Sequence, residues 1–156
     1  MRIAIDFDGT IVEQDRPYDD LETPLVFVAG AKEALLALQR AGHELLLWSA
    51  RSSAAARIDR YLNPWVRAGI DRTPLAVWEK RRVLNEQRYR QMLDFVAQEL
   101  PEVFAAVDEG LGGKPAVDLF IDDKALRLGA GVEALGWTEI AHIYGQAAPA
   151  APAQEA

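Results

Sequence analysis

Acidic side chains gather where two apolar runs of the sequence end. One pair follows the β-branched run Arg2–Ile5, and the other follows the apolar stretch 117–121. These acids are Asp6, Asp8, Asp122 and Asp123. Carboxylates only a few ångströms apart repel one another, so a site that keeps them ionised usually contains a divalent cation. Because oxygen ligands without His or Cys favour a hard ion, we expect Mg²⁺, although each acid alone is equally typical of a turn or a helix cap.

The elements that must position these residues alternate between strands and helices. The apolar patterning predicts strands over 2–5, 43–48, 75–78, 117–121 and 138–144, and helices over 30–41, from Ser52 or Ser53 to about 68, and over 82–100. Residues 11–28 read as an extended excursion or hairpin. The alternation predicts an α/β fold, a three-layer Rossmann-like sandwich with a central, mostly parallel sheet. We expect one domain over 1–145 and a disordered Ala/Pro-rich tail over 146–156.

In such sheets the ligand binds beyond the carboxyl ends of the strands, near the point where the strand order reverses. This rule selects three short segments that directly follow predicted strands. They are Asp6-Phe7-Asp8-Gly9-Thr10, Ser49-Ala50-Arg51 and Asp122-Asp123. The site is therefore expected to combine residues that are far apart in the sequence.

Composition restricts the class of partner. The 156 residues carry 17 basic and 24 acidic side chains, a formal net charge of −7, and no cysteine. Missing cysteines exclude disulfides and thiolate chemistry, and the acidic balance disfavours duplex nucleic acid. No apolar run approaches the ~20 residues of a membrane span, so we expect a cytoplasmic protein without a membrane partner. A homo-oligomer is left open.

The strand-end segments together resemble the motifs of the haloacid dehalogenase superfamily. Asp6-Phe7-Asp8-Gly9-Thr10 resembles the first motif, and Ser49 after a strand is similar to the second. Lys114 is a candidate for the third, and Asp122-Asp123 resembles the fourth. The order and the strand context match over about residues 1–145, so the resemblance implies a fold of this superfamily.

The resemblance also implies roles for the acids. Asp6 would be the nucleophile that forms an aspartyl-phosphate, and the side chain of Asp8 would serve as general acid and base. Mg²⁺ would be held by Asp6, by the backbone carbonyl of Asp8 and by the final pair of acids. We expect Asp123 to bind the ion directly and Asp122 to orient its waters.

The remaining candidates would meet the substrate. Ser49 would donate a hydrogen bond to a phosphoryl oxygen, and Lys114, or its competitor Lys80, would balance charge. The substrate side of the site comprises Thr10, Ser49, Ala50 and Arg51. Each has a structural alternative: Ser49 as a helix start, Lys114 as a solvated loop residue and Arg51 as a surface ion pair. Four arginines further along the chain read as a solvated helix face: Arg81, Arg82, Arg88 and Arg90.

These expectations describe a magnesium-dependent phosphomonoester hydrolase with a minimal cap, acting on a small phosphorylated metabolite, either a sugar phosphate or a nucleotide. One alternative is a phosphomutase or phosphotransferase of the same superfamily. Another is a phospho-receiver signalling domain, whose acceptor Asp ends the third strand. The third predicted strand here ends at Trp78-Glu79, which argues against a receiver.

Overall fold

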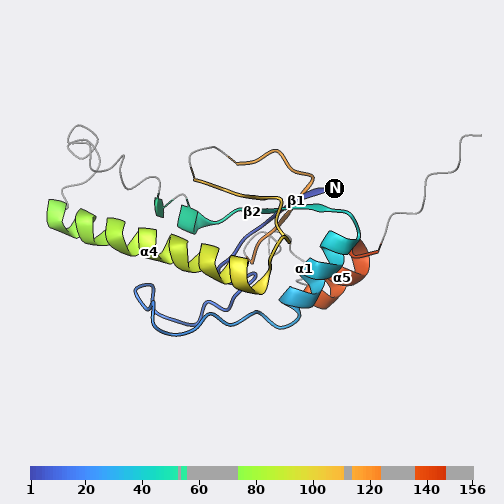
Figure 1. The fold of residues 1–156 in the computed structure, drawn as a ribbon, viewed down its shortest axis with the longest axis horizontal. Coiled ribbons are helices and arrows are strands. Elements are labelled where there is room, and N and C mark those ends of the chain that lie inside the picture. Colours follow the sequence, from blue (N-terminus) through green and yellow to red (C-terminus); the bar gives the residue numbers. More distant parts are fainter. Residues whose placement is uncertain (53, 56–73, 111–113, 124–135, 147–156) are drawn as a thin grey trace, which may run out of the picture.

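The computed structural model describes residues 1–52, 54–55, 74–110, 114–123 and 136–146 of the chain. Four strands form one sheet, β1 (Arg2–Ile5), β2 (Glu44–Leu47), β3 (Ala106–Val107) and β4 (Leu119–Ile121). The described helices are α1 (Ala31–Arg40), α4 (Leu75–Glu99) and α5 (Trp137–Tyr144). All strand pairs are parallel, in the order β3-β2-β1-β4 (Figure 1). The predicted α/β class with a parallel sheet is confirmed.

The strand order identifies where a ligand site belongs. β1 pairs with β2 on one side and with β4 on the other, so Ile5 lies opposite both Leu47 and Ile121. The order matches the first four strands of the Rossmann arrangement 3-2-1-4-5-6, in which the connections reverse direction between strands 1 and 4. The carboxyl ends of β1 and β4 therefore lie beside each other at the switch point.

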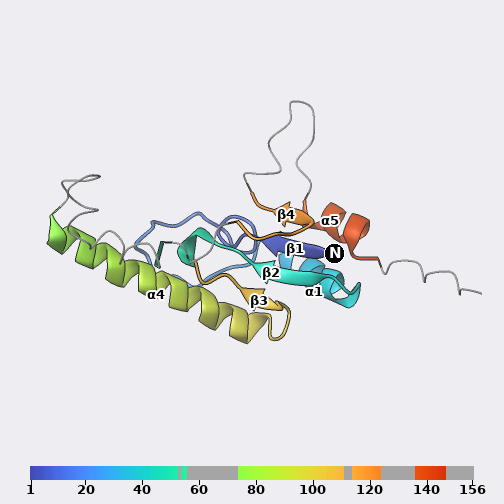
Figure 2. The ribbon, with the colours of Figure 1, turned by 90° about the horizontal axis from the view of Figure 1, so that it is seen from above.

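The core lies between the sheet and the three described helices. Alternate residues of a strand point to the same face, and Ile3 and Ile5 of β1 are fully buried. Figures 1 and 2 show α1 beneath the strands and α4 running along the β3 side. The same cluster contains Leu45, Leu47, Ile121, Leu35, Leu38, Met92, Val96, Trp137 and Ile140. This packing fixes the strand ends from which the acids emerge.

Most predicted elements are found with small changes of boundary. The strands expected over 2–5, 43–48 and 117–121 are β1, β2 and β4, and the helices expected over 30–41 and 82–100 are α1 and α4. Residues 11–28 form a hairpin, in which Val28 N donates to Ile11 O at 2.9 Å and Glu13 N donates to Val26 O at 2.9 Å. The helix expected from Ser52 or Ser53 begins earlier, at Ala50. Its expected end near 68 and the tail from 147 lie outside the described residues.

Two predicted strands are wrong. Residues 75–78 are the first turn of α4, and 138–144 lie in α5. Both are short runs rich in apolar residues, which periodicity alone cannot assign to strand or helix. In α5 the buried residues Trp137 and Ile140 are three positions apart, which is helical spacing. The two-residue strand β3 was not predicted, because so short a segment carries no pattern.

None of the helices in the described ranges combines the length and the apolar composition that crossing a bilayer would require.

Candidate active site and metal centre

Three carboxylates meet at the switch point of the sheet. Asp6 directly follows β1, and its N–H donates to Ile121 O at 3.0 Å, which continues the pairing with β4 by one residue. Asp122 and Asp123 directly follow β4. One carboxylate oxygen from each of the three acids lies within 4.8 Å of the others. Two distant parts of the sequence thus supply one acidic cluster, as the strand-end rule predicts.

The cluster changes the acidity of its central member. The pKa of the Asp6 carboxyl is raised from 3.8 to about 7, mainly because burial removes the carboxylate from water. A hydrogen bond from the Phe7 backbone opposes this rise, whereas the charges of Asp122, Asp8 and Asp123 reinforce it. Without a cation, protonated and ionised Asp6 are therefore both populated at neutral pH.

Residues of the first loop hold Asp123 in place. Gly9 has φ +79°, and a Cβ added there would lie 2.9 Å from Asp123 Oδ2, so a side chain would strain the backbone and displace the carboxylate. The hydroxyl of Thr10 accepts a hydrogen bond from Asp123 N at 2.9 Å. Trp137 Nε1 donates to Thr10 O at 2.7 Å and ties the same loop to α5. Thr10 was expected on the substrate side, but these contacts give it a positioning role.

The donor set suits a hard divalent cation. Mg²⁺ prefers oxygen ligands and is commonly held by one or two carboxylates together with water and substrate phosphate. Asp6, Asp122 and Asp123 provide carboxylate oxygens from two adjacent strand ends. The raised pKa of Asp6 shows that like charges and burial act on the cluster, and a cation would relieve that repulsion. These residues therefore fit the ion that the sequence implies.

The side chain of Asp8 turns to a different partner. Its two oxygens accept hydrogen bonds from Arg51, from Nε at 2.8 Å and from Nη2 at 2.7 Å. Arg51 is only 4% exposed, and its guanidinium carbon lies 4.9 Å from the centre of the Phe7 ring. The expectation of a surface ion pair for Arg51 does not hold, because this pair is largely removed from water.

A second arginine joins this pair from α4. Arg88 is 7% exposed, and its Nη2 lies 3.6 Å from Asp8 Oδ2. The expectation that Arg88 belongs to a solvated helix face is therefore wrong. Arg88 lies four and eight residues before the buried Met92 and Val96. This helical spacing is the sequence signal that could have placed Arg88 on the inner face of α4.

Ser49 and Ala50 connect β2 to the next helix. The buried Ser49 accepts a hydrogen bond from Arg51 N at 3.2 Å, as a helix-capping residue does. That bond uses an oxygen lone pair and leaves the hydroxyl proton for another acceptor. The hydroxyl of Ser52 lies 2.6 Å from Ser49 O and 2.9 Å from Asp108 Oδ2, and these two acceptors share its single proton, which links this turn to the end of β3. Ala50 is exposed.

The two candidate lysines are placed differently from the acids. The ammonium of Lys114 lies 3.9 Å from the centre of the Phe120 ring on β4 and is exposed. Lys80 is exposed on the second turn of α4. The main causes of the raised pKa of Asp6 are burial and the charges of the neighbouring acids, and neither lysine is among them. In the described part of the chain, Arg51 and Arg88 are the cations that border Asp8.

Two modest cavities border the acids. A cavity of about 170 Å³ is lined by Asp6, Asp8, Tyr18, Arg51 and Arg88, among others. A second cavity, of about 200 Å³, is lined by Gly9, Thr10, Asp122, Asp123 and Trp137, among others. Asp6 and Asp8 therefore face a space that also contains both buried guanidinium groups.

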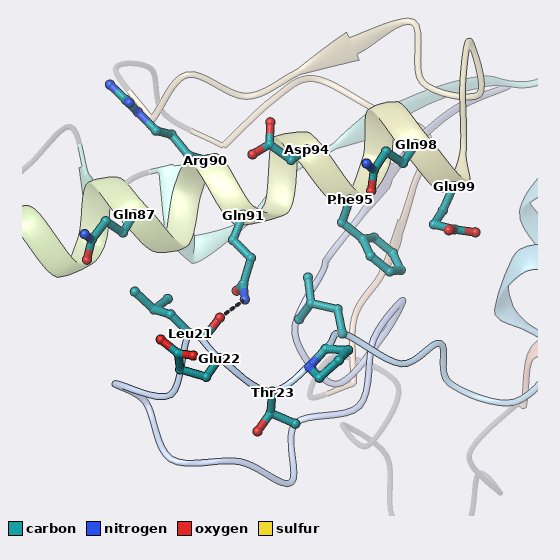
Figure 3. Close-up of a pocket in the computed structure, with 12 residues that line it drawn as sticks. Leu21, Glu22, Thr23, Gln87, Arg90, Gln91, Asp94, Phe95, Gln98 and Glu99 are labelled. Atoms are coloured by element: carbon teal, nitrogen blue, oxygen red, sulfur yellow. Dashed lines mark hydrogen bonds between the residues drawn. The ribbon is translucent and has the colours of Figure 1, made fainter.

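A larger cavity lies elsewhere. It measures about 520 Å³ and separates the loop 21–25 from α4 (Figure 3). Gln91 donates to Leu21 O at 3.2 Å across it, and Asp94, Phe95 and Glu99 form its helical wall. None of the strand-end acids lines this space. We therefore place the chemistry at the smaller cavity, where the ionisable groups converge.

Comparison with protein-family models, with curated proteins and with solved structures gave no match to this chain.

Proposed function

We propose that the protein is a magnesium-dependent phosphomonoester hydrolase with a fold of the haloacid dehalogenase type, acting through an aspartyl-phosphate on a small phosphorylated substrate. The observation that carries this proposal is the convergence of Asp6, Asp122 and Asp123 within 4.8 Å at the switch point of a parallel sheet. When bound there, Mg²⁺ would neutralise charge on the carboxylates and on the phosphoryl oxygens. The sequence resemblance supports the same assignment.

The chemistry proceeds in two steps on this chain's own residues. In the first, an Asp6 oxygen forms a bond to phosphorus, the bond from phosphorus to the ester oxygen breaks, and Asp8 gives its proton to the departing alcohol. In the second, water attacks the aspartyl-phosphate and Asp8 takes its proton. Phosphate leaves and Asp6 is restored. Ser49 lies two residues after β2, and its hydroxyl proton can be donated to a phosphoryl oxygen.

The ion pair between Asp8 and Arg51 bears on the first step. Asp8 can donate a proton only after its carboxylate leaves the bidentate contact with Arg51 and takes up a proton, from solvent in the first turnover and from the attacking water in each later one. A phosphoryl group is itself a strong bidentate acceptor for a guanidinium. The substrate therefore competes with Asp8 for Arg51, and binding would release Asp8 toward the ester oxygen. Lys114 could supply further positive charge, although its present contact is with Phe120.

The test is turnover of p-nitrophenyl phosphate by the wild type and two variants, with Mg²⁺ and with EDTA. We expect turnover only with Mg²⁺, and none from Asp6→Asn. Because p-nitrophenolate departs without help from an acid, Asp8→Asn should release about one equivalent quickly and then stall. Asp94→Asn, which removes an exposed acid of α4, is the control and should retain wild-type turnover.

Several outcomes would contradict the proposal. Full turnover in EDTA would remove the role of the metal, and turnover by Asp6→Asn would remove the nucleophile. If the wild type were a receiver domain, it would be phosphorylated once and would not turn over. The order of the described strands disfavours that alternative: in the flavodoxin-like strand order of receivers the third strand pairs with the first, whereas the third described strand, β3, pairs with β2. The expected strand ending at Trp78-Glu79 does not bear on this alternative, because Trp78 lies in α4.

A further inference from the structure

Two buried arginines share one carboxylate beside the proposed nucleophile. In the part of the chain that the structure describes, Asp8 lies within 4 Å of both guanidinium groups, at 2.7 Å from Arg51 and 3.6 Å from Arg88. Both arginines are more than nine-tenths buried. Burying a guanidinium is costly unless it is paired with an anion. The pKa of Arg88 is lowered, chiefly by burial and then by the charge of Arg51. The two guanidinium groups thus share one carboxylate within 4 Å among the described residues.

The two arginines differ in how fully their donors are used. Arg51 makes four hydrogen bonds, two to Asp8 and two from Nη1, to Arg88 O at 2.9 Å and to Gln91 Oε1 at 3.1 Å. Arg88 has the same five N–H donors, but among the described residues its side chain makes one hydrogen bond, from Nη1 to Tyr18 O at 2.5 Å. Arg88 therefore retains the capacity to bind an anion in a bidentate manner.

Arg88 is also held ready for such a ligand. Its guanidinium carbon lies 4.0 Å from the centre of the Tyr18 ring, and the hydroxyl of Tyr18 donates to the buried Asn85, one turn before Arg88 on α4. A guanidinium stacked on an aromatic face loses less conformational freedom when it binds. Arg16 and Glu13 line a separate hollow of about 80 Å³, which shares Asp8, Arg51 and Arg88 with the cavity of Asp6 and Asp8.

We propose that Arg88 binds a second anionic group of the substrate, so that the preferred substrates are phosphomonoesters whose alcohol part carries a carboxylate or another phosphate. This inference rests on the proposed function, which places Asp8 beside the ester oxygen. A side chain that contacts Asp8 therefore borders the alcohol that leaves. The cavity of about 170 Å³ exceeds the ~30 Å³ of a water molecule several times over, which leaves room for a short anionic substituent.

The first test needs only the wild type and three esters with the same three-carbon chain. They are 3-hydroxypropyl phosphate, 3-phosphonooxypropanoate and 1,3-propanediol bisphosphate. We expect kcat/KM to be at least about tenfold higher for one or both anionic esters than for the neutral one, because a hydrogen-bonded charge pair commonly contributes that much. The two anionic esters separate carboxylate from phosphate recognition. Equal values, or a preference for the neutral ester, would overturn the inference.

The second test assigns the preference to Arg88. The preference is the ratio of kcat/KM for an anionic ester to that for the neutral ester, and Arg88→Gln should reduce it to near one. Arg90→Gln is the matched control, since it removes the same charge from an exposed position two residues along α4 and should preserve the ratio. If Arg88→Gln slows all three esters equally, Arg88 serves the phosphoryl group and the inference is wrong. If Arg88→Gln does not fold, Arg88→Lys replaces it. The comparison of the three esters with the wild type still decides whether a second anion is recognised.

Failure of this inference is distinguishable from failure of the proposed function. Turnover without a preference rejects the second anion site alone. If no phosphomonoester is hydrolysed, the proposed function fails, and calorimetric binding of the same three esters decides the question of the site. Tighter binding of an anionic ester that is lost in Arg88→Gln then supports the site, and equal binding overturns it.

Discussion

At the scale of single residues, Gly9 decides whether Asp123 can join the acidic cluster. Its φ of +79° favours glycine, and its missing side chain leaves room for the Asp123 carboxylate. Gly42 has a similar φ of +82°, but nothing lies within 4 Å of where its Cβ would be. The two glycines therefore share the backbone requirement and differ in the close approach to an acid.

We expect Gly9→Ala to weaken both stability and Mg²⁺ binding. The left-handed backbone should cost ~1–2 kcal/mol in the free energy of unfolding, and displacement of Asp123 should lower Mg²⁺ affinity at least about tenfold. Gly42→Ala should incur the backbone cost and leave the affinity unchanged. Urea unfolding and calorimetric titration with Mg²⁺ measure the two effects. Equal Mg²⁺ affinity in both variants would contradict the contact with Asp123.

The sequence predicted the acids of the site better than its cations. Asp6, Asp122 and Asp123 follow strands that the apolar runs reveal, and parallel pairing then brings their side chains together. Arg88 lies in the middle of a helix, and its partners Asp8 and Tyr18 are about seventy or more residues away. Only tertiary packing shows that such a residue is buried. The same limitation applies to Lys114, which the sequence favoured for charge balance and the structure places on Phe120.

At the scale of elements, Arg51 fastens α4 to the ends of the strands. Arg51 lies shortly after β2 in the sequence. Its side chain pairs with Asp8, which follows β1, and donates hydrogen bonds to Arg88 O and to Gln91 on α4. The inner face of α4 is polar at Asn85 and Arg88 and becomes apolar at Met92 and Val96. The apolar pattern predicts the helix only from 82, because the short apolar run 75–78 has no periodicity that separates a helix from a strand.

Removing Arg51 should therefore loosen α4. We expect Arg51→Met to lower the free energy of unfolding by ~3–5 kcal/mol, because it leaves the Asp8 carboxylate in a largely buried site without its bidentate partner and removes the hydrogen bonds to Arg88 O and Gln91. Arg82→Met is the control: Arg82 pairs with Glu86 on the exposed part of the same helix, and its loss should cost less than ~1 kcal/mol. Urea unfolding followed by circular dichroism measures both. Similar losses in the two variants would show that Arg51 has no special role.

At the scale of the whole molecule, the acidic cluster should make stability depend on pH and on metal. The carboxyl of Asp6 has a pKa of about 7 in the folded protein, against 3.8 as its ordinary value. Between these values the folded state holds a proton that the unfolded state releases, so the free energy of unfolding falls as the pH rises. This contribution is fully present below pH 3.8 and is lost as the pH passes about 7. The size of the effect is on the order of 4 kcal/mol.

In EDTA, we therefore expect the free energy of unfolding to decrease between about pH 5 and about pH 8, and Asp6→Asn to remove most of that decrease. Added Mg²⁺ should stabilise the wild type most at the alkaline end, because the ion binds the ionised carboxylate and competes with the proton. Urea unfolding across this range, with EDTA and with Mg²⁺, measures both slopes. If the metal-free protein instead gains stability with rising pH, or if Asp6→Asn keeps the wild-type slope, the Asp6 carboxyl is not the group that governs the pH dependence. If Mg²⁺ stabilises the protein equally at both ends of the pH range, the ion does not bind the Asp6 carboxylate.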